Sequence, residues 1–452
     1  MSARAKSDGR TGCGRRQFLK TGLAATGGWA LLNSCLLRVP AVAAEGKDVL
    51  GVQVDDLPLL GPYLLPTEAP HERIRVAFRG TDDKTRLAGG RLTYGLKSVG
   101  EKETAFTAAD KHVLELKDLA PDAEYQYRLK LGDYESPVHR FRTSPMPRQR
   151  AQRTKLALFF DFHCHAPQSV EAGEKGAGDF FTRFGHAMED IKKFAPDMLV
   201  LGGDIVQKGS RREEYETFFR IMREVCANSI LVPCPGNHEW VTDKDLSIYS
   251  DYLPAVGNGP ASDRAANWYF SFGGVGWQMR RTGMGGEWLR NSIRSLKQQH
   301  GADTIVDVQH HQVYQWAAKS TDLGKQGVCD LFDQEGGVRL CLFGHRHIHQ
   351  RSLPILFQGS GQATTKEKSE YPADTKGTIY MQSPSMWYQY TQALENELVA
   401  NNGKPKFEGE YTGYGEMTIT PEALLTETFV YEYNGKTRHE CVDQFRMLRP
   451  KA

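Results

Sequence analysis

Aspartate, asparagine and histidine residues follow five separate apolar segments of the chain. Oxygen and imidazole groups together suit zinc, iron or manganese, and the lack of cysteine in the glycine-bracketed motifs argues against a closed structural zinc site. Eight such groups are too many for one tetrahedral ion, so the pattern predicts two metal ions. The eight residues are Asp161, His163, Asp204, Asn237, His238, His310, His345 and His347.

The charge balance of such a site indicates its chemistry. Two divalent ions carry a charge of about +4, and Asp161 and Asp204 contribute about −2, so an excess positive charge remains for a phosphate group and a bound hydroxide. A metal pair about 3.5 Å apart lowers the pKa of bound water and holds both oxygens of an in-line displacement. The predicted reaction is phosphoester hydrolysis, and the metals stay open among Fe, Zn and Mn.

Short apolar runs must position these ligands. The run Leu199, Val200, Leu201 breaks at two glycines and is followed directly by Asp204, which is typical of a buried strand leaving its sheet. Ligands in α/β folds commonly lie at such strand ends, so the sequence predicts that the five ends meet at one edge. The other four runs are 156–160, 230–234, 305–308 and 340–343.

The residues of the ligand motifs and their order along the chain resemble those of the calcineurin-like metallophosphoesterases. With the β-rich segment that precedes them, the chain is most similar to the purple acid phosphatase branch. The motifs are Asp161-Phe162-His163, Gly203-Asp204, Gly236-Asn237-His238-Glu239, His310-His311 and Gly344-His345-Arg346-His347.

The resemblance implies a role for each matching residue. One metal would be bound by Asp161, His163 and His347, the other by Asn237, His310 and His345, and Asp204 would bridge both. His238 would contact the phosphate and stabilise or protonate the leaving oxygen. Arg346 and His311 could add charge at the rim and bind substrate, but a solvated charge for Arg346 and an ordinary histidine for His311 are the favoured alternatives.

Three positions depart from the purple acid phosphatase pattern. Gln207 stands where that branch has a metal-binding tyrosine, so the ferric tyrosinate and its colour are expected to be absent. Gln312 replaces a proline, and His349 replaces a common tyrosine. These departures bear on the substrate more than on the chemistry.

Residues outside the motifs are assigned structural roles. His165 and His349 lack ordered acidic partners and are expected to be ordinary core or surface histidines. The aromatic cluster Trp387, Tyr388, Tyr390 is expected to pack in the core and only alternatively to line the pocket.

The segment 45–147 reads as an all-β sandwich, because short alternating runs are separated by turn residues. The stretch Leu119–Tyr125 resembles the corner of a fibronectin type III module, in which a tyrosine hydroxyl ties back to nearby backbone. A polar, proline-marked linker at 145–154 predicts the domain boundary. Residues 148–452 are then the metallophosphoesterase domain, whose resemblance implies a two-sheet α/β/β/α sandwich.

Apolar residues at helical spacing predict four helices in that domain. Residues 359–415 are polar and are interpreted as an insertion or rim. Residues 416–449 return to alternating strands with a turn at Asn434-Gly435 and are expected to close a sheet. The helical patterns cover 181–194, 215–225, 287–299 and 328–332.

The first 44 residues read as an export signal of the twin-arginine type. Arg15 and Arg16 precede a weakly apolar stretch at 21–37, and a small-residue cleavage site lies near Ala44. That stretch is too polar and too short for a membrane anchor. A lipoprotein cleavage box before Cys35 is an open alternative. The expected location is therefore periplasmic or secreted, reached through the twin-arginine machinery, which carries folded proteins and lets metal load in the cytoplasm.

Charge and cysteine content exclude some function classes. Residues 1–44 hold seven of the 57 basic and one of the 55 acidic residues, so the remaining chain has a net charge of about −4. This balance gives no support for nucleic-acid binding. Six of the eight cysteines lie beyond the leader without paired spacing and are expected to be small buried hydrophobes.

Three functions compete at this stage. The first is an exported metal-dependent phosphatase or phosphodiesterase, and the second is an envelope docking protein with structural or vestigial metals. The presence of His238 speaks against the second, because a structural site does not need it. Nucleic-acid cleavage is the third and is disfavoured by the charge.

Overall fold

The structure is a computed structural model of the 452-residue chain. It describes residues 59–81, 86–166, 177–312, 327–357, 361–387, 397–401, 411–432 and 440–451. The predicted export signal, Cys35, Tyr388, Tyr390 and the turn at Asn434-Gly435 lie outside these residues. Among the residues described, no helix is both long and apolar enough to cross a membrane.

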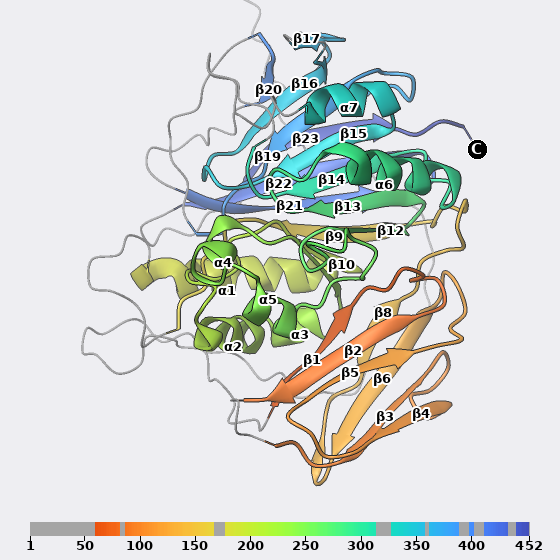
Figure 1. Cartoon of the computed structure of the whole chain (residues 1–452), viewed down its shortest axis with the longest axis vertical. Coiled ribbons are helices and arrows are strands. Elements are labelled where there is room, and N and C mark those ends of the chain that lie inside the picture. The colour runs from red at the N-terminus through yellow and green to blue at the C-terminus, as the bar shows by residue number, and fades with distance from the viewer. Residues whose placement is uncertain are drawn as a thin grey trace, which may run out of the picture. The chain divides into compact units, whose positions relative to one another are not determined.

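The N-terminal part is β-rich, as the alternating pattern predicts. Its strands lie in two sheets, and apolar residues of both sheets, such as Phe78 and Tyr127, belong to one buried core (Figure 1). One sheet contains β3 (Gly90–Gly95), β4 (Lys102–Phe106), β6 (Glu124–Leu131), β7 (Tyr134–Glu135) and β8 (His139–Arg142). The other contains β1 (Leu59–Leu65), β2 (Ile74–Gly80) and β5 (Lys111–Leu116).

The tyrosine corner predicted at Leu119–Tyr125 is confirmed. The hydroxyl of Tyr125 accepts a hydrogen bond of 2.7 Å from the backbone N–H of Ala120. Its ring is buried and stacks on Phe141 at 5.3 Å. This contact fixes the corner locally, while the specific likeness to a fibronectin type III module stays a prediction.

The β-rich part shares a sheet with the part of the chain that follows residue 148. Strand β1 pairs in parallel with β11 through Leu64 and Ile230, so β1, β2 and β5 extend a ten-stranded sheet. The order is β18-β23-β22-β21-β9-β10-β11-β1-β2-β5. Its remaining members are β9 (Thr154–Phe159), β10 (Met198–Leu201), β11 (Ile230–Pro233), β18 (Glu370–Tyr371), β21 (Tyr411–Ile419), β22 (Ala423–Glu432) and β23 (Glu440–Leu448).

A second sheet of eight strands precedes the other predicted ligands, at 310, 345 and 347. Its order is β12-β13-β14-β15-β19-β16-β17, and β20 pairs with β16. Strands β13, β14, β15 and β19 run parallel to one another. The strands are β12 (Trp268–Phe272), β13 (Val275–Arg280), β14 (Ile305–Gln309), β15 (Val338–Phe343), β16 (Gln350–Leu356), β17 (Gln362–Ala363), β19 (Thr378–Gln382) and β20 (Val399–Asn401).

Helices cover the outer faces of the two sheets (Figure 1). Residues such as Met188 and Phe218 pack on the ten-stranded sheet, and Leu289 and Phe332 pack on the other. The core that contains Phe78 and Tyr127 also includes Leu158 and Val306. It therefore joins strands of both large sheets, which gives the expected α/β/β/α arrangement. The helices are α1 (Ala177–Phe194), α2 (Arg212–Ile221), α3 (Arg223–Cys226), α4 (Asn237–Thr242), α5 (Ser247–Tyr252), α6 (Gly286–Gln298) and α7 (Val328–Glu335).

The interpretation of 359–415 as a polar insertion is wrong for its middle. Strand β19 is buried throughout and lies between β15 and β16 in the second sheet. Its apolar run is only Ile379, Tyr380 and Met381, and polar residues on both sides hid it in the sequence. The interpretation of 416–449 is confirmed, because β21 pairs with β9 and closes the ten-stranded sheet.

Candidate metal centre

The predicted ligands follow the carboxyl ends of strands from both sheets. In the ten-stranded sheet, Asp204 comes after β10, between the ends of β9 and β11, which supply the first and third motifs. Strands β9, β10 and β11 end in register, with Leu201 opposite both Phe159 and Pro233. In the second sheet, His310 follows β14 and the histidines of the last motif follow β15.

The first group brings together Asp161, His163 and His347. The Nε2 atoms of the two histidines are 3.1 Å apart, and that of His347 is 3.6 Å from Oδ1 of Asp161. Two ligands about 2.1 Å from one ion are separated by roughly these distances. The three side chains therefore converge on one position of metal size.

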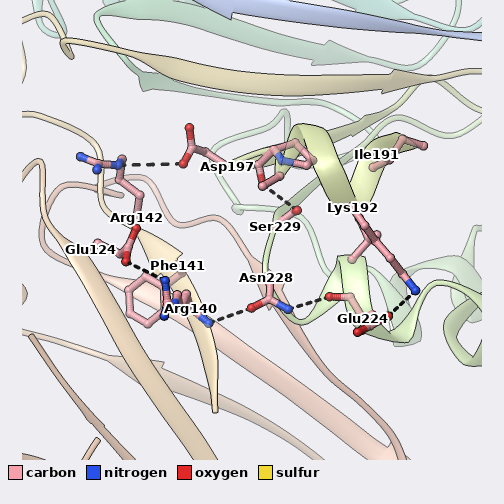
Figure 2. A pocket seen from close by; sticks show the side chains of 13 residues that line it. Glu124, Arg140, Phe141, Arg142, Ile191, Lys192, Asp197, Glu224, Asn228 and Ser229 are labelled. Carbon is pink, nitrogen blue, oxygen red and sulfur yellow. Dashed lines mark hydrogen bonds and ion pairs between the residues drawn. The ribbon is translucent and has the colours of Figure 1, made fainter. Parts of the chain in front are cut away.

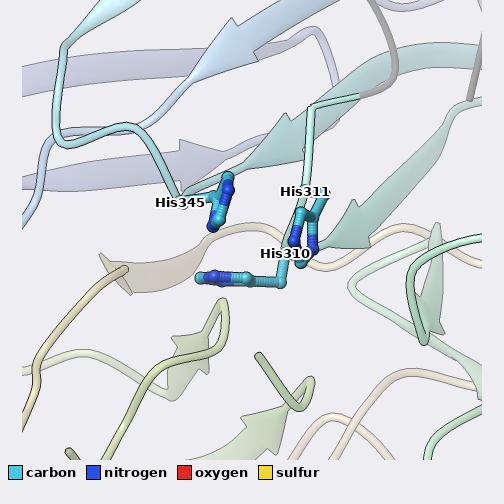
Figure 3. A group of neighbouring side chains, drawn as sticks. All are labelled: His310, His311 and His345. Carbon is cyan, nitrogen blue, oxygen red and sulfur yellow. The ribbon is translucent and has the colours of Figure 1, made fainter. Parts of the chain in front are cut away.

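The second group brings together Asn237, His310 and His345. Oδ1 of Asn237 is 3.0 Å from Nε2 of His310 and 2.9 Å from Nδ1 of His345. Figure 3 shows the imidazoles of His310 and His345 directed toward one another from neighbouring strand ends. These separations again match ligands of a single ion.

Asp204 lies between the two groups. Its Oδ2 atom is 3.0 Å from Nε2 of His310 and 3.7 Å from Nε2 of His163. Its Oδ1 atom accepts a hydrogen bond of 2.9 Å from the backbone N–H of His238. One oxygen is thus anchored by backbone and the other faces both groups, which is the placement a bridging carboxylate requires.

The backbone at the ligands is left-handed. Residues other than glycine rarely adopt a positive φ. Five predicted ligands have φ values between +49° and +77°: Asp161, His163, Asp204, His345 and His347. Five of the ten such non-glycine residues in the described chain thus belong to the site. Conformations of this kind persist only where surrounding contacts hold them, and they gather at functional sites.

Two motif glycines are needed because other atoms approach them closely. A Cβ atom at Gly236 would lie 2.2 Å from Oδ1 of Asp204, and one at Gly344 would lie 2.7 Å from Oδ2 of Asp161. Both distances are shorter than van der Waals contact. Any side chain at either position would therefore displace a predicted ligand.

Burial keeps most of the histidine ligands neutral. It lowers the pKa of His345 and of His347 to about 4 and holds that of His163 well below its usual range. Neutral imidazoles keep the lone pair that a metal needs. At His310 burial also opposes the charge, but the carboxylate of Asp204 outweighs it and raises the pKa to about 9.

The two carboxyl groups respond differently to the same burial. Desolvation raises the pKa of Asp161 to about 7. At Asp204 desolvation is outweighed by His310, which holds the pKa well below its usual range. Of these two carboxylates, the negative charge of Asp161 is therefore the one that the surrounding protein stabilises less.

The residues fit a metal ion at this position. The Oδ2 atom of Asp161 is buried and has no hydrogen-bond partner among the residues that the structure describes. A buried carboxylate oxygen without a partner is costly, and a cation removes that cost. With imidazole nitrogens and an amide oxygen as its neighbours, the donor set suits zinc, iron or manganese.

Gln207 orients two histidines of the site. Its side-chain oxygen is 2.9 Å from Nδ1 of His163, and its backbone oxygen is 2.7 Å from Nδ1 of His238. Each Nδ1–H donates to the oxygen, so each Nε2 faces the centre. A hydrogen bond of this kind fixes the ring and the tautomer of a metal-binding histidine. The sequence had marked this position only as a departure from a related branch.

Glu239 is a site residue to which the sequence reading gave no role. Its buried carboxylate accepts hydrogen bonds of 2.6–3.1 Å from the backbone N–H groups of Asp204, Ile205, Val206 and Gly236. These bonds tie the turn after β10 to the turn after β11. The only available signal was its place in the Gly-Asn-His-Glu motif, where a glutamate three residues after a helix cap accepts the cap N–H.

The remaining predicted residues lie in different surroundings. His238 has 29% of its side chain exposed, with Nε2 3.9 Å from Oδ2 of Asp204. His311 packs against the ring of His345 at 4.0 Å (Figure 3). Arg346 is exposed and has no side-chain bond among the described residues. The interactions of Arg346 give no support for substrate binding.

The histidines assigned structural roles lie in the core. His349 is buried between the backbone oxygen of Gln382, at 3.0 Å from Nδ1, and Oδ2 of Asp443, at 3.2 Å from Nε2. His165 is buried, and its ring lies 5.0 Å from that of Trp387, whose side chain belongs to the core as expected. The described cysteines form no disulfide, and all but Cys441 are buried.

A cavity of about 360 Å³ lies away from the metal centre, where the β-rich part meets α1 and α3 (Figure 2). Its charged residues pair with one another. Arg142 lies 3.9 Å from Asp197, Arg140 lies 3.6 Å from Glu124, and Lys192 pairs with Glu224. These pairs favour a structural contact rather than a ligand site.

Comparisons with known proteins agree with this geometry. Residues 155–349 match the family model described as calcineurin-like phosphoesterase. The purple acid phosphatase PPD1 from yellow lupin (Lupinus luteus) seeds is 18% identical over 86% of this chain and 74% of its own, with a TM-score of 0.64. The solved structure of PhoD has 14% sequence identity to this chain and a TM-score of 0.59, and the alignment covers 86% of this chain and 93% of the PhoD chain. The search of curated proteins found no significant match. At these identities the two structures indicate a shared fold.

Proposed function

We propose that this metal-dependent phosphoester hydrolase works with two metal ions and acts after export from the cytoplasm. The premise is the match of residues 155–349 to the calcineurin-like phosphoesterase family. The observation that carries the two-metal part is the position of Asp204. Its Oδ2 atom faces both ligand groups, at 3.0 Å and 3.7 Å from their nearest nitrogens.

Seven side chains would hold the ions. Asp204 would be shared between the groups. When bound, two such ions supply the positive charge that attracts a phosphate group and makes water nucleophilic near neutral pH. One ion would be held by Asp161, His163 and His347, the other by Asn237, His310 and His345.

His238 is assigned to the leaving oxygen. Because its Nδ1–H donates to the backbone oxygen of Gln207, its Nε2 is the atom that can carry or receive a proton at the centre. The partial exposure of the ring lets a substrate reach it. A protein that used metals only for structure would have no need of this exposed imidazole, which favours hydrolysis over the docking alternative.

The N-terminal sequence supports export. Arg15 and Arg16 precede the apolar stretch and the small residues at Ala43 and Ala44. Export would place the hydrolase in the periplasm or outside the cell, where phosphoester substrates are scavenged or remodelled. Anchoring through Cys35 is the alternative end state of the same route.

The function is tested by replacing the bridging carboxylate. Asp204→Asn should lower kcat/KM on aryl phosphate and bis-aryl phosphate by at least about a hundredfold. A chelator should abolish wild-type turnover, and added Zn²⁺, Mn²⁺ or iron should restore it. Asp133→Asn, at an exposed turn of the β-rich part, is the matched control and should not change turnover.

Location is tested in the same strain. Full-length protein should fractionate outside the cytoplasm, and Arg15→Lys with Arg16→Lys should retain it inside. Unchanged turnover of Asp204→Asn would disprove the catalytic proposal. A wild-type protein found in the cytoplasm would disprove export alone.

A further inference from the structure

The edge of the second sheet continues beyond the metal centre at β13. Strands β13 and β14 are parallel, and Arg280 pairs with Gln309. Arg281 and Thr282 therefore emerge directly beside His310 and His311. Ligands of parallel sheets bind at this edge, so the residues after β13 occupy the next position along the site.

A series of ring contacts connects Arg281 to the second ligand group. The ring of His311 lies 4.0 Å from that of the predicted ligand His345 and 5.5 Å from that of Trp240, to which it is nearly parallel. The guanidinium of Arg281 lies 5.1 Å over the indole of Trp240. A guanidinium on an aromatic face is held in place without using its N–H donors.

The side-chain donors of Arg281 and Trp240 make no hydrogen bond to a residue that the structure describes. Among the residues that the structure describes, the side chain of Arg281 makes no hydrogen bond, and its nearest carboxylate is that of Asp263 at 3.6 Å. The indole N–H of Trp240 likewise has no hydrogen-bond partner among the described residues. About 31% of the Arg281 side chain is exposed, so a ligand can reach it.

His311 adds a third donor. The Thr282 hydroxyl accepts the backbone N–H of His311 at 3.2 Å and lies 2.8 Å from its Nδ1. When the hydroxyl donates to Nδ1, the ring proton of His311 lies on Nε2. No other hydrogen bond holds that proton among the described residues. Three donor side chains, Arg281, Trp240 and His311, thus face solvent or one another next to the metal centre.

We propose that Arg281, Trp240 and His311 form an anion subsite that binds a second anionic group of the substrate, a phosphate or carboxylate on the organic part of the phosphoester. Donors without acceptors, one of them a guanidinium, select an anion. The ion pair with Asp263 is 3.6 Å long, so an anion on the guanidinium would compete with this carboxylate. This substrate class rests on the proposed hydrolysis, but binding to the subsite can be measured without it.

The test uses ligands that differ only in charge. Calorimetry on full-length, zinc-loaded protein compares (4-carboxyphenyl)phosphonate with (4-carbamoylphenyl)phosphonate, which are not hydrolysed. The wild type should bind the carboxylate more tightly. Arg281→Gln should weaken binding of the carboxylate ligand about fivefold or more and change the affinity for the carboxamide ligand less than about twofold. Arg294→Gln, at an exposed ion pair of α6, is the matched control and should change neither.

The corresponding phosphates extend the test to turnover. Arg281→Gln should lower kcat/KM for 4-carboxyphenyl phosphate selectively, and Trp240→Phe, which keeps the ring and removes the N–H, should do so by a smaller factor. A wild type without preference for the carboxylate, or equal losses on both ligands in Arg281→Gln, overturns the subsite. Preferential binding without hydrolysis of either phosphate supports the subsite and instead overturns the proposed function.

Discussion

Removing the side chain of Gln207 should weaken one metal position and spare the other. The amide oxygen of Gln207 is 2.9 Å from Nδ1 of His163, a predicted ligand of the first group. Gln207→Ala deletes that acceptor but keeps the backbone oxygen that holds His238 at 2.7 Å. The substitution therefore separates the orientation of a ligand from the orientation of the proposed proton donor.

The size of the effect follows from what the ring loses. A neutral hydrogen bond of this kind contributes about 1 kcal/mol net, and the freed imidazole also loses its fixed tautomer. Loss of such a partner typically weakens metal affinity by about 10- to 100-fold. We expect this loss at the position of Asp161, His163 and His347, with the other position changed less than about twofold. At saturating metal, turnover should fall only a few-fold, because His238 keeps its contact.

The assay is competition with a chelator on metal-free protein, which reports two affinities. Gln207→Glu keeps an acceptor oxygen and should retain tight binding at both positions. Gln298→Ala, on the exposed side of α6, controls for loss of an amide elsewhere. Two unchanged affinities in Gln207→Ala, or an equal loss at both, would show that the side chain does not orient His163.

Two further substitutions probe stability. Glu239→Gln replaces one acceptor oxygen by an NH₂ group that faces two buried backbone N–H donors, because each oxygen of Glu239 accepts two such bonds. Urea denaturation of the metal-free protein should therefore show a loss of about 2–4 kcal/mol, and an unchanged unfolding midpoint would contradict the network. Burial raises the pKa of Glu416 from 4.5 to about 7, so ionisation destabilises the fold as pH rises from about 4.5 through 7. Glu416→Gln should therefore gain about 1–2 kcal/mol over the wild type at pH 8, after allowance for partial exposure, and nothing at pH 4; an equal gain at both would contradict this.

The proximity of the predicted ligands could be foreseen because each of them follows an apolar strand. Parallel strands end at a common edge, so the order of the motifs was enough to bring Asp204 together with residues up to 143 positions away, at His347. The corner at Tyr125 was predictable for a similar reason, since its hydrogen bond to Ala120 spans only five residues. Local pattern and strand polarity suffice for contacts of these two kinds.

Other features depend on contacts that no local pattern carries. Strand β19 has three apolar residues among polar ones. It is buried because it pairs with β15 inside the second sheet. The pairing of β1 with β11 joins segments about 166 positions apart at a single residue pair. Arg281 follows β13, a strand that the sequence reading did not identify, so the position next to the metal centre was not recognised.

Hydrogen bonds between the turns that carry the predicted ligands help to hold their strained backbone. Each left-handed non-glycine residue costs about 1–3 kcal/mol, and five of them lie at the ligands. Backbone bonds that oppose this cost run between the ligand turns themselves: His163 donates to Asp204 at 2.8 Å, and the N–H of His345 donates to Oδ1 of Asp161 at 2.7 Å. The first of these bonds joins two backbone groups, so it holds the turns without using a side-chain atom of either predicted ligand. These bonds offset part of the strain, and a cation at the centre would offset the cost of the buried, unpartnered Oδ2 atom of Asp161.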